Sequence, residues 1–311
     1  MSVVYQLRSH QKHSHLKFAY LDGHHHSDFA AHKHDFSELF FVTSGSGKHT
    51  VADHEYPIRK GDVFVINGDI EHGFSDVKKL EVVNLMFDAK RPFFELPSMR
   101  QLPGYQAMFK IEPIARQTTE YKAKLTLDRQ QLLEIEHLLT VIKTEYESYQ
   151  PAFEVMLTSS MQQLVIRLAR IYQDSSSDLP PTTIALSRAL VFIEQNFNDA
   201  EVNTDTIAKA AFISKRQMER LFRQFMNSSP NQYLKQIQLN YAVKLLDSGS
   251  DLTIQYIAEN CGFSDSNYFS KCFKQQFRCS PRAYRKRAIV ERGDTNADRY
   301  RCISWKDGQA L

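Results

Sequence analysis

The sequence lacks the features that mark membrane, secreted and disulfide-bonded proteins. No run in its 311 residues approaches the roughly 20 apolar residues that span a bilayer, so no membrane partner is expected. The first eight residues lack the apolar core of a signal peptide, which predicts a cytoplasmic location. The four cysteines include no C-x-x-C pair, which argues against a disulfide framework and against a zinc module.

The formal net charge of +3 is the sum of two unequal halves. Residues 1–180 carry 20 Lys and Arg against 23 Asp and Glu, a net charge of −3, whereas residues 181–311 carry 19 against 13, a net charge of +6. Histidine has the opposite bias, since 11 of the 12 lie in the first 72 residues. A basic half predicts a polyanionic partner for that half alone.

Hydrophobic patterning separates a β-rich part from a helical part. Between Ser37 and Asp88, short apolar runs with Gly, Asn and Asp turns predict an antiparallel barrel or sandwich, and Ser44 to Gly47 is expected to be one of the turns. A second helix is predicted over about 153–172, after a first helix with a narrow apolar stripe. Either both helices pack only on their own barrel, or one of them also supplies a dimer seam, which the long and narrow stripe favours. The stripe residues are Leu132, Ile135, Leu139, Ile142 and Tyr146.

A tandem repeat follows a polar, serine-rich stretch at 174–183, which is stiffened by Pro180-Pro181 and predicts a linker. Two copies of helix, tight turn, helix and Ser-Pro-x-x-Tyr lie about 50 residues apart, and each has the pattern of a helix-turn-helix. Ser214 is the expected N-cap in the first copy. In the second copy Gly262 supplies the turn, and Ser264 or Asp265 the cap.

The outward side chains of the second helix in each copy suit the reading of DNA bases. Arg and Lys donate to guanine, and Asn pairs with adenine, in the major groove. The acid-free stretch 266–290 adds cations that can follow phosphates. A solvated basic helix face is the alternative, but the tandem arrangement favours double-stranded DNA. The outward residues are Arg216, Gln217, Arg220 and Arg223, then Asn267, Ser270, Lys271 and Lys274.

The stretch from about Leu186 to Arg287 resembles the DNA-binding domain of the AraC/XylS family of bacterial transcription regulators. Its characteristic words are Gly262-Phe263-Ser264-Asp265-Ser266-Asn267-Tyr268-Phe269-Ser270, Phe273-Lys274 and Ser280-Pro281-x-x-Tyr284. The resemblance implies two helix-turn-helix units joined by a long helix over about 230–247, and a homodimer that works with RNA polymerase. By position it assigns DNA contacts to Lys215, Arg216, Glu219 and Arg220, and to Ser266, Asn267, Ser270 and Lys271.

The histidine-rich half contains two motifs that resemble those of cupins. His32-x-His34-x-x-x-Glu38 matches the first motif, and the run from Gly61 to His72 resembles the second. Alternating strand residues point into one barrel, so His32, His34, Glu38 and His72 can converge on a divalent metal. Two alternatives are a pocket that binds an organic ligand without a metal, and a relic site that keeps the motif residues but has no function. The other N-terminal histidines, His24 to His26 with His10, His13 and His15, are expected in a flexible arm or loop.

Within the family, residues 29–88 and 102–113 resemble the L-rhamnose-type regulators, which implies a small sugar as effector. Candidate ligand-binding residues are His32, His34, Glu38, Phe40, His72 and Asn84. The predicted fold is α+β and multidomain. Residues 1–173 are expected to form a cupin-like β-barrel with two dimerisation-type helices, followed by a linker at 174–183. An all-α tandem helix-turn-helix domain is expected over 184–287. The extension at 288–311 is expected to be disordered or to form an added helix.

The leading hypothesis is a ligand-responsive transcription regulator, an activator of a carbohydrate-utilisation operon, that needs no cofactor and is not an enzyme. One alternative is a metal-dependent cupin enzyme fused to a DNA-binding domain. Another is a metal or pH sensor that uses the histidines themselves. Effector, operator and sign of regulation stay open.

Overall fold

The computed structural model describes residues 3–118, 124–174, 179–248 and 252–293, with the backbone alone for 288–293. Contacts divide the chain into two units, Met1–Ser187 and Arg188–Leu311. None of the helices among the described residues combines the length and the apolarity that crossing a bilayer requires. The predicted extension falls on residues 288–311, of which 294–311 and the side chains of 288–293 lie outside the description.

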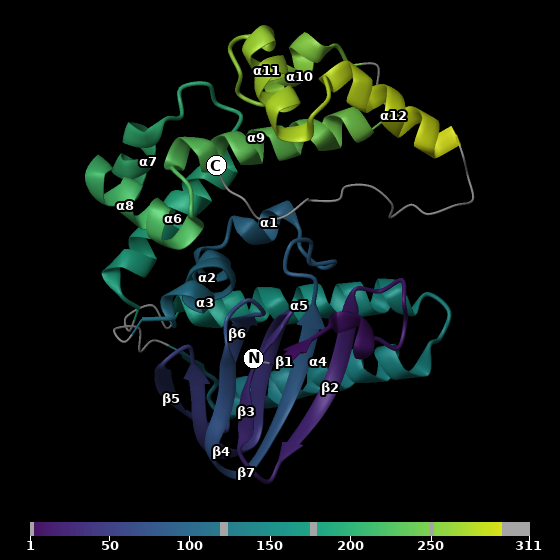
Figure 1. The fold of residues 1–311 in the computed structure, drawn as a ribbon, viewed down its shortest axis with the longest axis vertical. Coiled ribbons are helices and arrows are strands. Elements are labelled where there is room, and N and C mark those ends of the chain that lie inside the picture. Colours follow the sequence, from purple (N-terminus) through teal and green to yellow (C-terminus); the bar gives the residue numbers. More distant parts are fainter. Residues whose placement is uncertain (1–2, 119–123, 175–178, 249–251, 294–311) are drawn as a thin grey trace. The chain divides into compact units, whose positions relative to one another are not determined.

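The first unit is a curled sheet with helices on one face (Figure 1). Its strands are β1 (Val3–Tyr5), β2 (Phe18–His25), β3 (Phe29–His34), β4 (Ser37–Val51), β5 (His54–Arg59), β6 (Asp62–Asn67), β7 (His72–Phe87) and β8 (Leu125–Thr126). Its helices are η1 (Leu7–Ser9), α1 (Pro97–Arg100), α2 (Pro103–Tyr105), η2 (Gln106–Ile111), α3 (Glu112–Ala115), α4 (Arg129–Ser148) and α5 (Phe153–Asp174).

Two long strands, β4 and β7, organise the sheet. The hydrogen-bonded order is β1-β3-β7-β4-β6-β8, with β2 also paired to β7 and β5 to β4. Each long strand changes partner along its length, because β4 pairs first with β6 and then with β5, while β7 pairs first with β3 and then with β2. The sheet is therefore bent across both strands.

The turn expected at Ser44 to Gly47 is absent, and this prediction was wrong. β4 runs through the segment without a break, and its register against β7 shifts three times between Val42 and Lys48. Gly45 has φ +75, and a Cβ there would lie 2.1 Å from the Lys79 carbonyl oxygen. A glycine-mediated bulge therefore bends the strand where the sequence pattern predicted a turn.

The two faces of the sheet bury different clusters. One face carries Phe40, Phe64, Phe74 and Val82, which pack on one another. The opposite face packs on α4 and α5, and all five stripe residues of α4 lie in that core. The apolar stripe of α4 therefore packs against the chain's own sheet and is not available to a second copy. The stripe was the reason for expecting a dimer seam, and this reason was wrong. Helix α4 is capped by Asp128, whose side chain accepts from the backbone N–H of Gln131.

Helical backbone occupies both ends of the predicted linker. Helix α5 ends at Asp174, and α6 (Pro181–Asn196) begins at the second proline of the pair, a position where proline is tolerated. Residues 175–178, the middle of the linker, lie outside the described residues.

The second unit is all-helical in its described residues and contains the tandem repeat. The helices after α6 are α7 (Thr204–Ala210), α8 (Lys215–Met226), α9 (Pro230–Asp247), α10 (Ile254–Asn260), α11 (Ser266–Phe277) and α12 (Pro281–Gly293). The predicted caps are confirmed at Ser214 and, between the two alternatives in the second copy, at Asp265. The long helix α9 has the predicted bounds.

Candidate functional site

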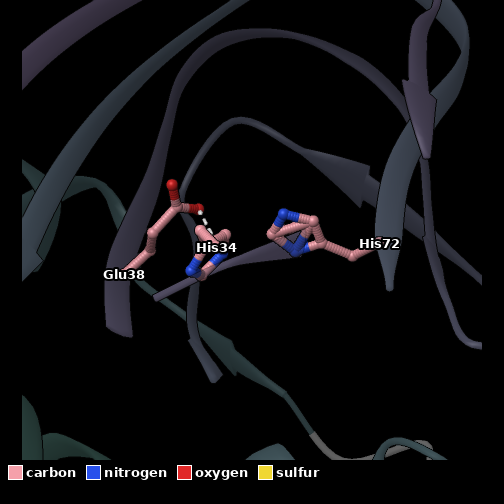
Figure 2. Close-up of side chains that lie close together, drawn as sticks. All are labelled: His34, Glu38 and His72. Atoms are coloured by element: carbon pink, nitrogen blue, oxygen red, sulfur yellow. Dashed lines mark ion pairs between the residues drawn. The ribbon is translucent and has the colours of Figure 1, made fainter. Parts of the chain in front are cut away.

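Four of the predicted ligand-binding residues gather in one buried group, which we call the His–Glu cluster: His32, His34, Glu38 and His72. His32 and His34 lie on β3, Glu38 at the start of β4 and His72 at the start of β7. Exposed fractions are between 1% and 7%, so the cluster is sealed from solvent. Ligand atoms of His34, Glu38 and His72 all lie within 4.8 Å of one another (Figure 2).

Hydrogen bonds order the imidazoles of this cluster. His34 Nδ1 lies 2.6 Å from the Phe36 carbonyl oxygen, and His32 Nδ1 lies 3.1 Å from the Ala30 carbonyl oxygen. The Nε2 atoms of His32 and His72 are 2.9 Å apart. His34 Nε2 and Glu38 Oε2 are separated by 3.8 Å, the pair marked in Figure 2.

Burial keeps the cluster uncharged. It raises the pKa of the Glu38 carboxyl to about 8 and lowers the pKa of His34 to about 4. Burial also lowers the pKa of His32 and that of His72, and in His72 the neighbouring imidazoles add to the effect. At pH 7 the neutral forms of His34 and Glu38 predominate, so their contact is not an ion pair in the absence of a bound cation.

The remaining two predicted pocket residues lie beside each other on neighbouring strands. Phe40 on β4 is in register with Asn84 on β7. Phe40 is fully buried and stacks on Phe74 with ring centroids 5.1 Å apart, so it belongs to the apolar cluster of that face. Asn84 Oδ1 is buried and has no hydrogen-bond partner among the described residues.

His49, which the sequence patterns did not single out, belongs to the same face. It is completely buried, and both of its ring nitrogens lack a partner within the described parts of the chain. Its ring lies 5.1 Å from that of Phe74 and 5.6 Å from that of His72. Burial lowers the pKa of His49 to about 3, and the Arg116 cation adds to this. In a regular strand every second residue after Glu38 shares its face, and this alternation places His49 on the opposite face. The bulge at Gly45 shifts the alternation and turns His49 to the face of Glu38.

Among the described residues, the one buried cation beside this face is paired with an acid. Arg116 donates from Nε and Nη2 to Glu112 Oε1 at 2.9 and 2.5 Å, and both side chains are nearly inaccessible. The guanidinium also lies over the rings of Phe64 and Tyr56. Its charge is therefore neutralised within the protein.

The expectation of a flexible arm or loop was wrong for His24 and His25, whereas His10, His13, His15 and His26 do lie in turns and bends. His24 and His25 belong to β2, which pairs with β7 as far as His25 against Leu80. His13 stacks on Tyr149 with centroids 4.6 Å apart, and its Nε2 lies 3.1 Å from the Tyr146 carbonyl oxygen. Non-local pairing and aromatic packing hold residues that the local pattern could not place.

In the second unit, the first helix-turn-helix presents its predicted reading side chains to solvent. Met218, Leu221 and Phe222 are buried on the opposite face of α8. Lys215, Arg216, Glu219 and Arg220 are exposed. Lys215 is tied to Asp205 on α7, with 3.0 Å between Nζ and Oδ2, which leaves Arg216 and Arg220 as the cations less engaged with the protein.

The second helix-turn-helix repeats this geometry with smaller side chains. Phe269, Cys272 and Phe273 form the buried face of α11. Asn267, Lys271 and Lys274 are exposed, whereas Ser266 and Ser270 are half-buried. Both Gly262 and its counterpart Phe212 in the first repeat adopt positive φ, +78 and +57. The two helix-turn-helix copies therefore share one turn geometry.

Comparison with known proteins assigns both parts of the chain. Residues 15–165 match the model of the AraC-like ligand binding domain, and residues 207–287 match a helix-turn-helix domain. The chain is 31% identical over 259 residues to the HTH-type transcriptional activator RhaR of Escherichia coli K12, covering 83% of this chain and 87% of that protein. The chain belongs to the AraC family.

This AraC-family protein is thus a DNA-binding transcription regulator with an effector domain, and the alternative of an enzyme is removed. RhaR of Shigella dysenteriae serotype 1 matches with the same identity and coverage. Among solved structures, an AraC-type regulator from Chromobacterium violaceum matches with 34% identity over 33% of this chain and 91% of that chain, at a TM-score of 0.31.

Proposed function

We propose that this regulator activates a carbohydrate-utilisation operon in response to a neutral sugar bound on the inner face of its sheet. The observation that carries the proposal is the union, in one chain, of an AraC-like ligand binding domain and a basic tandem helix-turn-helix. The resemblance to L-rhamnose-type regulators supports a sugar. A DNA partner supports a cytoplasmic location. The proposal also includes the domain limits: an effector domain over 1–173, a linker over 174–183 and a DNA-binding domain over 184–287.

The buried polar groups support a neutral rather than an anionic effector. The ring nitrogens of His49 and the Oδ1 of Asn84 have no hydrogen-bond partner in the described part of the chain, so they can bind hydroxyl groups. A buried polar group without a partner costs about 1–3 kcal/mol. The positive charge of Arg116 is matched by Glu112, so it does not select a carboxylate ligand. Sugar hydroxyls both donate and accept, which suits this set.

In the proposed complex with DNA, α8 and α11 enter successive major grooves about 34 Å apart. Arg216, Arg220, Asn267 and Lys271 read base edges, with Glu219, Ser266 and Ser270 beside them. Lys274 and Lys215 contact phosphates. Activation requires that the bound regulator also engages RNA polymerase.

A homodimer is proposed through the outer faces of α4 and α5. Leu133 on α4 and Val155 and Met156 on α5 are 60%, 66% and 48% exposed. These residues differ from the buried stripe of α4, so they are available to a partner. An isologous dimer would bury them against the same residues of a second copy.

A thermal-shift screen with pentoses, hexoses and deoxysugars, followed by gel-shift titration, tests the proposal. We expect at least one neutral sugar to raise the melting temperature and to change the affinity for promoter DNA. By linkage, DNA must change the affinity for that sugar by the same factor. If sugar acids act and neutral sugars do not, or if no sugar changes DNA binding, the sugar proposal is wrong.

A further inference from the structure

The His–Glu cluster contains atoms whose hydrogen-bonding capacity the protein leaves unused. His34 Nε2 and His72 Nδ1 are buried and have no hydrogen-bond partner among the described residues. Both belong to the group of three side chains, completed by Glu38, whose ligand atoms lie within 4.8 Å of one another. In Figure 2 the three side chains, which come from three strands, extend toward one common space.

The hydrogen bond of His34 determines its tautomer. Its Nδ1 faces the Phe36 carbonyl oxygen at 2.6 Å, and because a carbonyl accepts only, Nδ1 must carry the hydrogen. In the neutral ring Nε2 then presents a bare lone pair. That lone pair is directed to the side of the ring where Glu38 lies.

A relay through His32 determines the tautomer of His72. The Ala30 carbonyl oxygen requires a hydrogen on His32 Nδ1, so His32 Nε2 is an acceptor. His72 Nε2 lies 2.9 Å from it and must therefore donate. This places the lone pair of His72 on Nδ1, the atom that has no partner in the described structure.

We propose that His34, Glu38 and His72 bind one divalent first-row transition-metal ion, and that His32 is a positioning residue that holds His72 in the binding tautomer. Two imidazoles and one carboxylate suit Zn²⁺, Fe²⁺, Co²⁺ or Ni²⁺, whereas Ca²⁺ and Mg²⁺ prefer oxygen ligands alone. A backbone carbonyl that accepts from the other ring nitrogen is a usual outer partner of a ligand histidine, and here the Phe36 carbonyl holds His34 in this way while the imidazole of His32 holds His72. The inference goes beyond the sugar proposal and stands without it.

Metal titration of the full-length, untagged protein tests the site. After treatment with a chelator, Zn²⁺ is titrated by calorimetry and Co²⁺ by visible absorption, with the metal ion as the only ligand. We expect one ion per chain, and a loss of affinity greater than about 100-fold in Glu38→Gln and in His72→Gln. The control is the double variant His24→Gln/His26→Gln, which removes two exposed histidines and should bind as the parent does.

Variants of His32 separate positioning from a merely structural role. His32→Phe removes the acceptor for His72 and should weaken Co²⁺ binding about 10- to 100-fold with a shifted visible spectrum. His32→Gln keeps an acceptor and should retain more of the affinity. Urea unfolding without metal reports any structural effect of either change separately.

The outcomes are distinguishable from those of the sugar screen. Stoichiometric binding that survives in Glu38→Gln but disappears in His24→Gln/His26→Gln would mean adventitious surface binding and overturn the site. So would the absence of binding in the parent protein. If Zn²⁺ binds at one ion per chain while every sugar fails, the metal site stands and the sugar proposal falls.

Discussion

At the scale of single residues, His49 combines complete burial with two ring nitrogens that have no hydrogen-bond partner among the described residues. The cost of leaving such atoms without partners is removed by an apolar side chain of similar size. We predict that His49→Leu raises the free energy of unfolding by about 1–3 kcal/mol and abolishes the response to the effector. Urea unfolding and effector-dependent gel shifts measure the two effects.

The control for this change is His54→Leu on β5, a half-buried position on the same sheet. Its effect on stability should stay within about 0.5 kcal/mol, as for ordinary surface changes. A destabilised His49→Leu protein would show that the imidazole has a structural partner, and a retained response would remove His49 from the effector site.

The cysteines of the second repeat are predicted to differ in reactivity because of burial. Burial raises the pKa of the Cys261 thiol to about 12, against an ordinary value of 9.0. Since the thiolate is the nucleophile, at pH 8 the reactive fraction is about a thousandfold below that of an unshifted thiol. In a Cys302→Ser background a thiol reagent should label the half-buried Cys279 first and Cys261 only after denaturation. Rapid labelling of Cys261 in the native protein would contradict its burial.

At the scale of elements, the two helix-turn-helix units need the same left-handed turn but fill it differently. At Gly262 a Cβ would lie 2.6 Å from the Phe197 carbonyl oxygen, whereas Phe212 occupies the equivalent turn with its side chain 81% exposed. We predict that Gly262→Ala lowers the free energy of unfolding of the second helix-turn-helix by about 1–2 kcal/mol or more. The matched change Phe212→Gly should be neutral or stabilising by up to about 1 kcal/mol.

Thermal unfolding and DNA affinity measure this pair of substitutions. Gly262→Ala should also weaken DNA binding, because α10 and α11 are joined through the turn. Equal effects of the two substitutions would show that turn strain does not separate the repeats.

The recognition helices should contribute to DNA binding in two ways. Arg220→Ala, at a base-reading position, should weaken binding to the operator by about 1–3 kcal/mol and relax its specificity. Lys274→Ala should weaken binding to all sequences alike and reduce the salt dependence by about one counterion. Gel shifts at several salt concentrations measure both changes.

Arg170→Ala provides the charge-matched control, because Arg170 is exposed on α5 of the other unit. It should leave both the affinity and its salt dependence unchanged. If Arg220→Ala behaves as Arg170→Ala does, α8 is not a reading helix.

At the scale of the whole molecule, dimerisation is predicted to depend on the exposed apolar residues of α4 and α5. A charge placed in an apolar interface must be desolvated, so Val155→Lys should convert a dimer to a monomer and weaken DNA binding. Sedimentation velocity gives the oligomeric state. Glu154→Lys, at the neighbouring exposed position, is the control, and a monomeric parent protein would contradict the proposed dimer.

Much of the second unit could be predicted because its signals are local. Caps at Ser214 and Asp265, the positive φ of Gly262 and the stripe Met218, Leu221 and Phe222 depend on neighbours within one or two turns. The motifs in this stretch also identified the AraC family, which the comparisons confirm. The different charge of the two halves was equally a property of the sequence alone.

The first unit shows what only the tertiary structure decided. Alternation on short strands brought His34, Glu38 and His72 together, since residues two apart share a face. The bulge at Gly45, however, changes the register and turns His49 inward, and the α4 stripe is buried by a sheet formed far away in the chain. The role of His32 likewise depends on a hydrogen bond across 40 residues. Caps and periodicity are local and are written in the sequence, whereas register and tautomer depend on non-local pairing, which only the folded chain establishes.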